Sequence, residues 1–85
     1  MKTILAGTYD SSDCMILLKE NKTLQIEIDS VVIKQFGRQI KETILDVLNY
    51  RGYSNIYVKI TDKGALEYTI RARLNEALDR WENET

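Results

Sequence analysis

Two apolar stripes at helical spacing, separated by one alternating segment, most constrain how this chain can fold. The stripe in residues 31–50 consists of Ile33, Phe36, Ile40, Ile44 and Val47/Leu48, and the second consists of Leu66, Ile70, Leu74, Ala77/Leu78 and Trp81. Apolar residues at steps of three and four are typical of an amphipathic helix. Between the stripes, residues 56–60 alternate apolar and polar, which predicts a strand. Two such helices need one apolar surface to pack against, and a sheet supplies it.

Three further strands are predicted before the first helix, at residues 3–8, 14–19 and 23–28. A polar break at 20–22 separates the last two, so we expect them to form a hairpin. If strands 23–28 and 55–60 are parallel neighbours, the first helix is their right-handed crossover. The expected apolar face consists of Leu24, Ile26, Ile28, Ile56, Val58 and Ile60. The prediction is an α+β two-layer sandwich, with both helices on one face of an antiparallel or mixed sheet of three to four strands.

The ends of the helices have their own signals. Ser30 is a suitable N-cap for the first helix, and Gly52 lies where a left-handed C-terminal cap is common. For the second helix, Thr61 or Asp62 can provide the start, with Gly64 in the turn that leads into it.

Composition excludes several classes of function. We expect a single domain over residues 1–85, and a net charge of -1 argues against a nucleic-acid binder. The chain has no apolar run of about 18 residues, so no membrane span is expected. Cys14 is the single cysteine, which favours a cytoplasmic protein, and we expect it to be a half-buried strand residue. Without histidine, neither a catalytic pair nor a zinc site is expected.

Residues 6–15 predict an exposed loop between two anchored strands. Its centre, Asp10-Ser11-Ser12-Asp13, favours a turn because Ser and Asp side chains bond nearby backbone. By this pattern alone the two serines belong to a solvated turn, and the aspartates to turn chemistry more than to a metal site.

The segment Ala6-Gly7-Thr8-Tyr9-Asp10-Ser11-Ser12-Asp13 resembles the serine motif of the citrate lyase acyl carrier protein family, the gamma subunit of bacterial citrate lyase. That motif is approximately Ala-Gly-Thr-x-Glu-Ser-(Ser or Gly)-Asp. Three other stretches resemble the family in order and spacing: Val32–Gly37, Thr43–Leu48, and Asp62–Glu67 continuing to Arg73. Asp10 stands where Glu is usual, and Glu67-Tyr68 where Asp-Cys is common.

The resemblance implies that Ser11 carries a covalent arm, 2'-(5''-phosphoribosyl)-3'-dephospho-coenzyme A, whose thiol holds acetyl and citryl groups. It implies three partners: the alpha (transferase) subunit, the beta (lyase) subunit and a prosthetic-group transferase. The chain itself would supply no catalytic residue. We hypothesise that Asp10 and Asp13 either help to hold a metal on the triphosphate of the incoming prosthetic-group donor or repel the anionic arm once it is attached. We also expect the loop at 9–12 to be more exposed and mobile than the helices.

Two alternatives stay open. The carrier of malonate decarboxylase resembles this family and uses the same type of arm, although the stretches Gln35-Phe36-Gly37 and Asp62–Leu66 favour the citrate system. Composition alone also permits an unmodified α+β interaction module.

Overall fold

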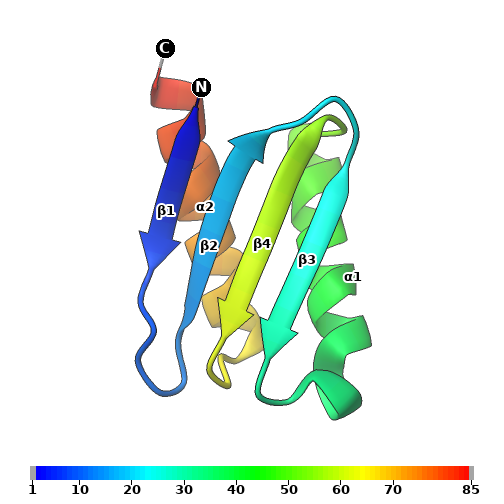
Figure 1. Cartoon of the computed structure of the whole chain (residues 1–85), viewed down its shortest axis with the longest axis vertical. Coiled ribbons are helices and arrows are strands. Elements are labelled where there is room, and N and C mark those ends of the chain that lie inside the picture. The colour runs from blue at the N-terminus through cyan, green and yellow to red at the C-terminus, as the bar shows by residue number, and fades with distance from the viewer. Residues whose placement is uncertain (1, 85) are drawn as a thin grey trace.

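The chain forms a four-stranded sheet with two helices packed on one of its faces (Figure 1). This computed structural model describes residues 2–84. The elements are β1 (Thr3–Gly7), β2 (Cys14–Glu20), β3 (Gln25–Ser30), α1 (Ile33–Arg51), β4 (Ile56–Asp62) and α2 (Glu67–Asn83). The predicted α+β sandwich is therefore confirmed, with four strands in a mixed sheet.

The order of the strands across the sheet is β1-β2-β4-β3. β1 and β4 both pair antiparallel with β2, and β3 pairs parallel with β4, so the predicted parallel neighbours on either side of α1 are confirmed. The predicted hairpin of residues 14–19 and 23–28 is wrong, because β4 lies between β2 and β3. The connection after β2 passes the end of β4 before β3 begins (Figure 1).

The core explains why β4 takes a central position. Its residues Ile56, Val58 and Ile60 are fully buried, as are Ile16 and Leu18 of the neighbouring β2. The inward residues of β3 are only half-buried, and its outward residues are polar, a pattern that suits an edge strand. Burial is therefore greatest in the two central strands of the sheet.

The predicted apolar stripes mostly reach the core, with exceptions at one end. Ile40, Ile44, Val47 and Leu48 of α1 are buried, and so are Ile70, Leu74, Ala77 and Leu78 of α2. Ile33 is 46% exposed, Phe36 45% and Leu66 61%, so these three stripe residues are not core. Leu24 precedes β3 and is 36% exposed, outside the expected apolar face.

The starts of both helices differ from the expectation. Val32 is the N-cap of α1, and Ser30 instead accepts the backbone N–H of Val32 on its hydroxyl oxygen, at 3.1 Å. α2 begins after Leu66, and the expected start at Thr61 or Asp62 belongs to β4. The predicted C-cap is confirmed, because Gly52 ends α1 with a φ of 82°.

Asp62 joins the approaches to both helices from a buried position at the end of β4. Its carboxylate accepts the Ser30 hydroxyl at 2.7 Å and the backbone N–H of Ala65 at 2.9 Å. The side chain is almost wholly buried, and these two donors compensate for its desolvation. Asp62, which the sequence suggests as a helix cap, thus links the β3–α1 connection to the β4–α2 loop through hydrogen bonds.

Three connections gather at one end of the molecule: the β1–β2 turn, the β3–α1 connection and the β4–α2 loop (Figure 1). The β2–β4 register pairs Cys14 with Asp62, which places the start of β2 beside the end of β4. The serine-bearing turn therefore lies next to the approach to α2. In the part of the chain that the structure describes, no helix is long and apolar enough to cross a membrane.

Candidate functional site

The two serines occupy the centre of a four-residue turn between β1 and β2. The N–H of Asp13 donates to the carbonyl of Asp10 at 3.1 Å and closes the turn. Ser12 has a φ of 67°, a left-handed conformation that the third position of a type II turn requires. Residues 9–12 are exposed, as predicted, and Ser11 lies at the tip.

The residues before the turn form a fixed neck. Ala6 is buried, and Gly7 has a φ of 109°, at which a Cβ would overlap the carbonyl oxygen of Cys14. The N–H of Thr8 donates to that same carbonyl at 3.2 Å. The Thr8 hydroxyl oxygen also accepts the N–H of Asp10 at 3.2 Å. Each residue of the Ala-Gly-Thr motif thus has a structural reason to precede the turn.

Asp13 fixes the other side of the turn. Its carboxylate accepts the Thr8 hydroxyl at 2.6 Å and the N–H of Cys14 at 2.8 Å. Arg73 of α2 donates to both carboxylate oxygens, with Nη2–Oδ2 at 2.7 Å and Nε–Oδ1 at 3.0 Å. The hydrogen bonds from Arg73 and Thr8 hold the pKa of Asp13 well below its usual range.

Backbone bonds attach the turn to the β4–α2 loop as well. The N–H of Ser12 donates to the carbonyl of Lys63 at 2.9 Å, and the N–H of Lys63 donates to the carbonyl of Asp13 at 2.9 Å. Two distant parts of the chain, the serine turn and the approach to α2, are therefore a single hydrogen-bonded unit. The bracing uses the neighbours of Ser11 and leaves its side chain at the exposed tip.

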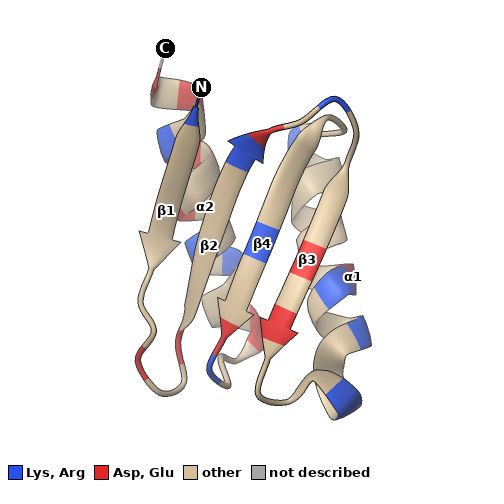
Figure 2. Ribbon diagram, viewed as in Figure 1, with Lys and Arg blue, Asp and Glu red and all other residues tan. Residues whose placement is uncertain are grey.

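The two aspartates have different surroundings. Both carboxylate oxygens of Asp13 are engaged with Arg73, Thr8 and the backbone, which supports turn chemistry as the role of this residue. Asp10 is exposed on the other side of the serines, and acidic residues flank the turn in Figure 2. Within residues 2–84 no group of three or more His, Cys, Asp or Glu side chains is placed to hold a metal ion.

Cys14, directly after the turn, is buried more deeply than the half-buried position expected for it. Burial, reinforced by the nearby Asp13 and Asp62 carboxylates, raises the pKa of its thiol to about 12. Its packing role in the strand is as expected, and its thiol is not a nucleophile near neutral pH.

The turn presents the Ser11 hydroxyl to solvent. An exposed primary hydroxyl at the tip of a braced turn is open to an incoming active site, and Ser11 has this position. The chain contains no histidine that could activate the serine. An exposed hydroxyl on a fixed turn is what a carrier protein needs if another enzyme is to load it.

Comparison with known sequences specifies the carrier. Residues 1–81 match the family described as malonate decarboxylase delta subunit. The citrate lyase acyl carrier protein of Halothermothrix orenii is 45% identical over 80 residues, covering 93% of this chain and 85% of the relative. That of Weissella paramesenteroides is 48% identical over 80 residues, covering 93% and 82%. That of Fusobacterium nucleatum is 45% identical over 83 residues, covering 94% and 88%. The chain belongs to the citrate lyase acyl carrier protein family.

The residues that hold the turn in place were not predicted from the sequence. Arg73 entered only as part of a matching stretch, and the backbone of Lys63 had no assigned role. The two are 60 and 50 positions from Asp13, and no local pattern connects them. The pairing of β2 with β4, which the sequence did not predict, brings residue 14 next to residue 62.

Proposed function

We propose that this chain is the acyl carrier subunit of citrate lyase and that Ser11 is its attachment point for the prosthetic group. The observation that carries the proposal is the turn itself, in which Ser11 is exposed while Gly7, Thr8, Asp13 and Arg73 fix the backbone around it. Family membership supports an acyl carrier role and a covalently attached group.

Attachment is a phosphoryl transfer to the serine oxygen. Ser11 Oγ forms a bond to the phosphorus of a 5''-triphosphoribosyl donor, the bond from that phosphorus to pyrophosphate breaks, and the Ser11 proton passes to a base of the transferring enzyme. Catalysis of such a step depends chiefly on positioning and charge neutralisation. A turn that is already braced offers the hydroxyl in one orientation, so less conformational entropy is lost when the enzyme binds it.

When bound, the prosthetic group supplies a thiol that carries acyl groups as thioesters. The contribution of this chain is to keep that thiol close to two other subunits, a transferase that exchanges acetyl for citrate and a lyase that releases oxaloacetate. Tethering raises the effective concentration of the acyl group at both active sites without any further contact. The residues of the turn hold the attachment point, and the exposed tip gives the tether room to move.

The test compares Ser11→Ala with Ser12→Ala, each co-expressed with the prosthetic-group transferase. Ser11→Ala is expected to show no mass increase and to support no citrate cleavage after reconstitution with the other two subunits. Ser12→Ala is the matched control, because it removes a hydroxyl from the adjacent exposed position. It is expected to load and to support cleavage.

The two variants separate the possible errors. Loading of Ser11→Ala together with failure of Ser12→Ala would move the attachment point by one residue. Loading of both variants would contradict the proposal that the carrier function depends on a single serine of this turn. Circular dichroism of both variants shows whether the fold is intact, as expected for substitutions at exposed turn positions.

A second candidate follows from the matching family description, which names malonate decarboxylase. In that case the chain would be loaded at the same serine but would serve a decarboxylase. Adding the loaded chain to carrier-depleted citrate lyase and to carrier-depleted malonate decarboxylase distinguishes the two. Restored citrate cleavage alone supports the first candidate, and restored decarboxylation alone supports the second. Protein that stays unmodified in its native host would contradict both and indicate an interaction module.

A further inference from the structure

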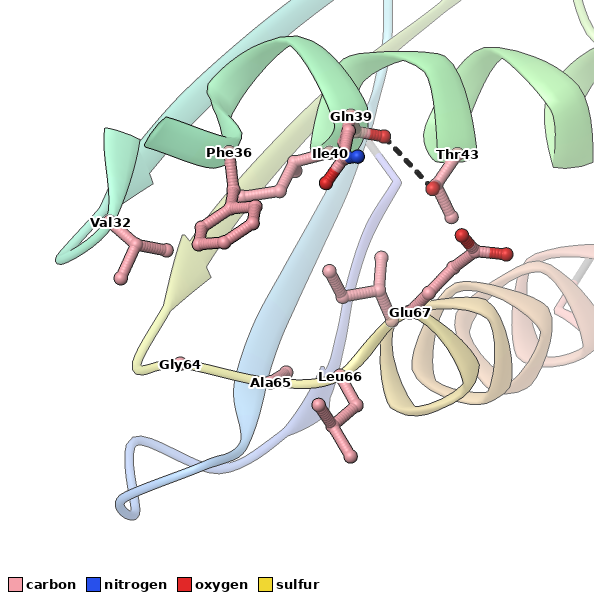
Figure 3. A pocket seen from close by; sticks show the side chains of 10 residues that line it. Val32, Phe36, Gln39, Ile40, Thr43, Gly64, Ala65, Leu66 and Glu67 are labelled. Carbon is pink, nitrogen blue, oxygen red and sulfur yellow. Dashed lines mark hydrogen bonds between the residues drawn. The ribbon is translucent and has the colours of Figure 1, made fainter. Parts of the chain in front are cut away.

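An apolar groove opens between the first turns of the two helices, at the same end of the molecule as Ser11 (Figure 3). Its volume is about 250 Å³. The buried side chains Ile40, Thr43 and Ile70 form its floor. Phe36 and Leu66 line its rim, and they are two of the three stripe residues that the core leaves exposed, the third being Ile33. The groove thus accounts for large apolar side chains that folding alone does not bury.

One wall of the groove continues directly into the serine turn. Gly64, Ala65 and Leu66 line the groove, and the preceding residue, Lys63, accepts the N–H of Ser12 at 2.9 Å. Three residues of extended chain span at most about 10 Å. A group attached to Ser11 is therefore only a short distance from the opening of the groove.

The lining of the groove suits one planar heterocycle. Pockets for drug-sized ligands measure roughly 300–1,000 Å³, so a groove of about 250 Å³ suits a single ring system better than a whole cofactor. Phe36 offers an aromatic face at the rim, on which a nucleobase can stack. Gln39 adds an amide that can donate and accept, the group that pairs with the edge of adenine in other proteins.

Thr43 and Glu67, together with Gln39, form the polar edge of the groove. The Thr43 hydroxyl donates to the carbonyl of Gln39 at 2.9 Å, so its oxygen retains lone pairs that can accept from an amino group. Glu67 lines the groove on the side of α2, opposite Thr43, and its carboxylate is another acceptor (Figure 3). Acceptors at this edge favour adenine, which has an exocyclic amino group, over a purine that has a carbonyl there.

We propose that this groove binds the adenine of the arm attached to Ser11, an inference that rests on the proposed function. Only one phosphate and one ribose separate the serine oxygen from the adenosine of that arm, and adenine is the aromatic ring of the arm. Tethering makes even a weak site effective, because a linked group has an effective concentration in the millimolar range. With the adenine held in the groove, the mobile part of the arm begins at the helices and not at Ser11. The thiol then swings from the groove.

The test begins with the unmodified chain, labelled with ¹⁵N and ¹³C, and three separate probes: 3'-dephospho-coenzyme A, adenosine 5'-monophosphate and pantetheine. The two adenine compounds are expected to shift the resonances of Phe36, Gln39 and Leu66 saturably at millimolar concentration, and pantetheine to leave them unchanged. Phe36→Ala is expected to raise the Kd at least five-fold. Tyr50→Ala is the matched control, since Tyr50 is a 92% exposed aromatic residue at the other end of α1.

The loaded chain gives the second arm of the test. Loading is expected to produce the same shifts at Phe36 and Leu66 as the free nucleotides, with nuclear Overhauser contacts from the Phe36 ring to adenine protons. Phe36→Ala is expected to load normally but to lose these contacts. A loaded chain with groove resonances identical to those of the unmodified chain would overturn the proposal. So would shifts caused by pantetheine alone, which would assign the groove to the thiol end of the arm.

Two further outcomes keep this inference apart from the proposed function. If intact mass shows Ser11 loaded while the groove does not respond, the carrier role stands and the adenine site is wrong. If Ser11 never loads but free nucleotides bind at Phe36, the groove is a purine site and the carrier proposal is wrong. Groove shifts that depend on protein concentration without any probe would indicate a second copy of this chain as the occupant, and would overturn the adenine site.

Discussion

Arg73 donates hydrogen bonds to both carboxylate oxygens of Asp13, although it lies 60 positions further along the chain. The Nη2–Oδ2 distance is 2.7 Å and the Nε–Oδ1 distance is 3.0 Å. Arg73 lies in the second turn of α2, and Asp13 is the last residue of the serine turn. A bidentate arginine–carboxylate pair fixes both distance and orientation. The position of Ser11 relative to the helices thus depends on a contact between residues that only the tertiary fold brings together.

Asp13→Asn is expected to lower the free energy of unfolding at pH 7 by about 2 kcal/mol, since hydrogen bonds to charged groups contribute about 1.5–3 kcal/mol. The pKa of Asp13 is lower in the folded protein than in the unfolded chain. Its stabilisation is therefore complete above about pH 4 and declines as the pH falls below that value. Urea denaturation of wild type and variant between pH 7 and pH 2.5 should show curves that converge in acid.

Asp10→Asn is the control for this comparison. Its carboxylate is exposed on the same turn, so the change is expected to alter the free energy of unfolding by less than about 0.5 kcal/mol. Equal losses in both variants would contradict the role assigned to the pair of Asp13 with Arg73.

Gly7→Ala is expected to destabilise the protein by about 3 kcal/mol or more, because the new Cβ would collide with the backbone of Cys14 at a φ of 109°. Gly52→Ala is the control that separates the cost of backbone strain from the cost of a steric collision. Gly52 has a φ of 82° but no atom within 4 Å of the added Cβ, so only about 1 kcal/mol should be lost. Thermal and urea unfolding of both variants measure the difference, and similar losses would argue against a closed neck at Gly7.

Much of the fold follows from local pattern. The helix predicted at 31–50 is observed at Ile33–Arg51, and every predicted strand is present. The neighbour of β2 could not be predicted in the same way, because alternation identifies a strand with one buried face and says nothing about which strand pairs with it. Four residues between β2 and β3 suit a hairpin as well as a connection past the end of β4. The inward residues of β4 are fully buried and those of β3 only half-buried, a difference that the structure shows and the similar alternation of the two segments does not.

In the site, too, the local features could be predicted from the sequence and the tertiary contacts could not. Exposure of Ser11 and the turn at Asp10–Asp13 follow from residues close in sequence, which Ser and Asp side chains organise locally. The bracing by Arg73 and Lys63 depends on tertiary contacts, and so does the burial of Cys14. Phe36 and Leu66 fit helical stripes by spacing, yet they lie at helix ends beyond the sheet, where nothing in the fold covers them.

The thiol of Cys14 is expected to resist alkylation in the folded protein. It is fully buried, and its pKa of about 12 leaves almost no thiolate at pH 8. Reaction with a maleimide should require unfolding, so its rate should rise with urea in step with the loss of helical circular dichroism. Rapid labelling in the absence of denaturant would show that the neck of the turn opens locally.

Ser12→Gly is expected to stabilise the protein while leaving loading at Ser11 intact. Ser12 adopts a φ of 67°, which costs a residue with a Cβ about 1 kcal/mol or more. Glycine removes that cost, although its unfolded chain is more flexible, so the net gain should be about 0.5 kcal/mol. The N–H of residue 12 still donates to Lys63, which keeps the turn attached to the approach to α2. Urea denaturation measures the gain and intact mass measures loading. Lower stability would contradict the left-handed backbone at this position, whereas higher stability with loss of loading would show that the Ser12 hydroxyl contacts the transferring enzyme.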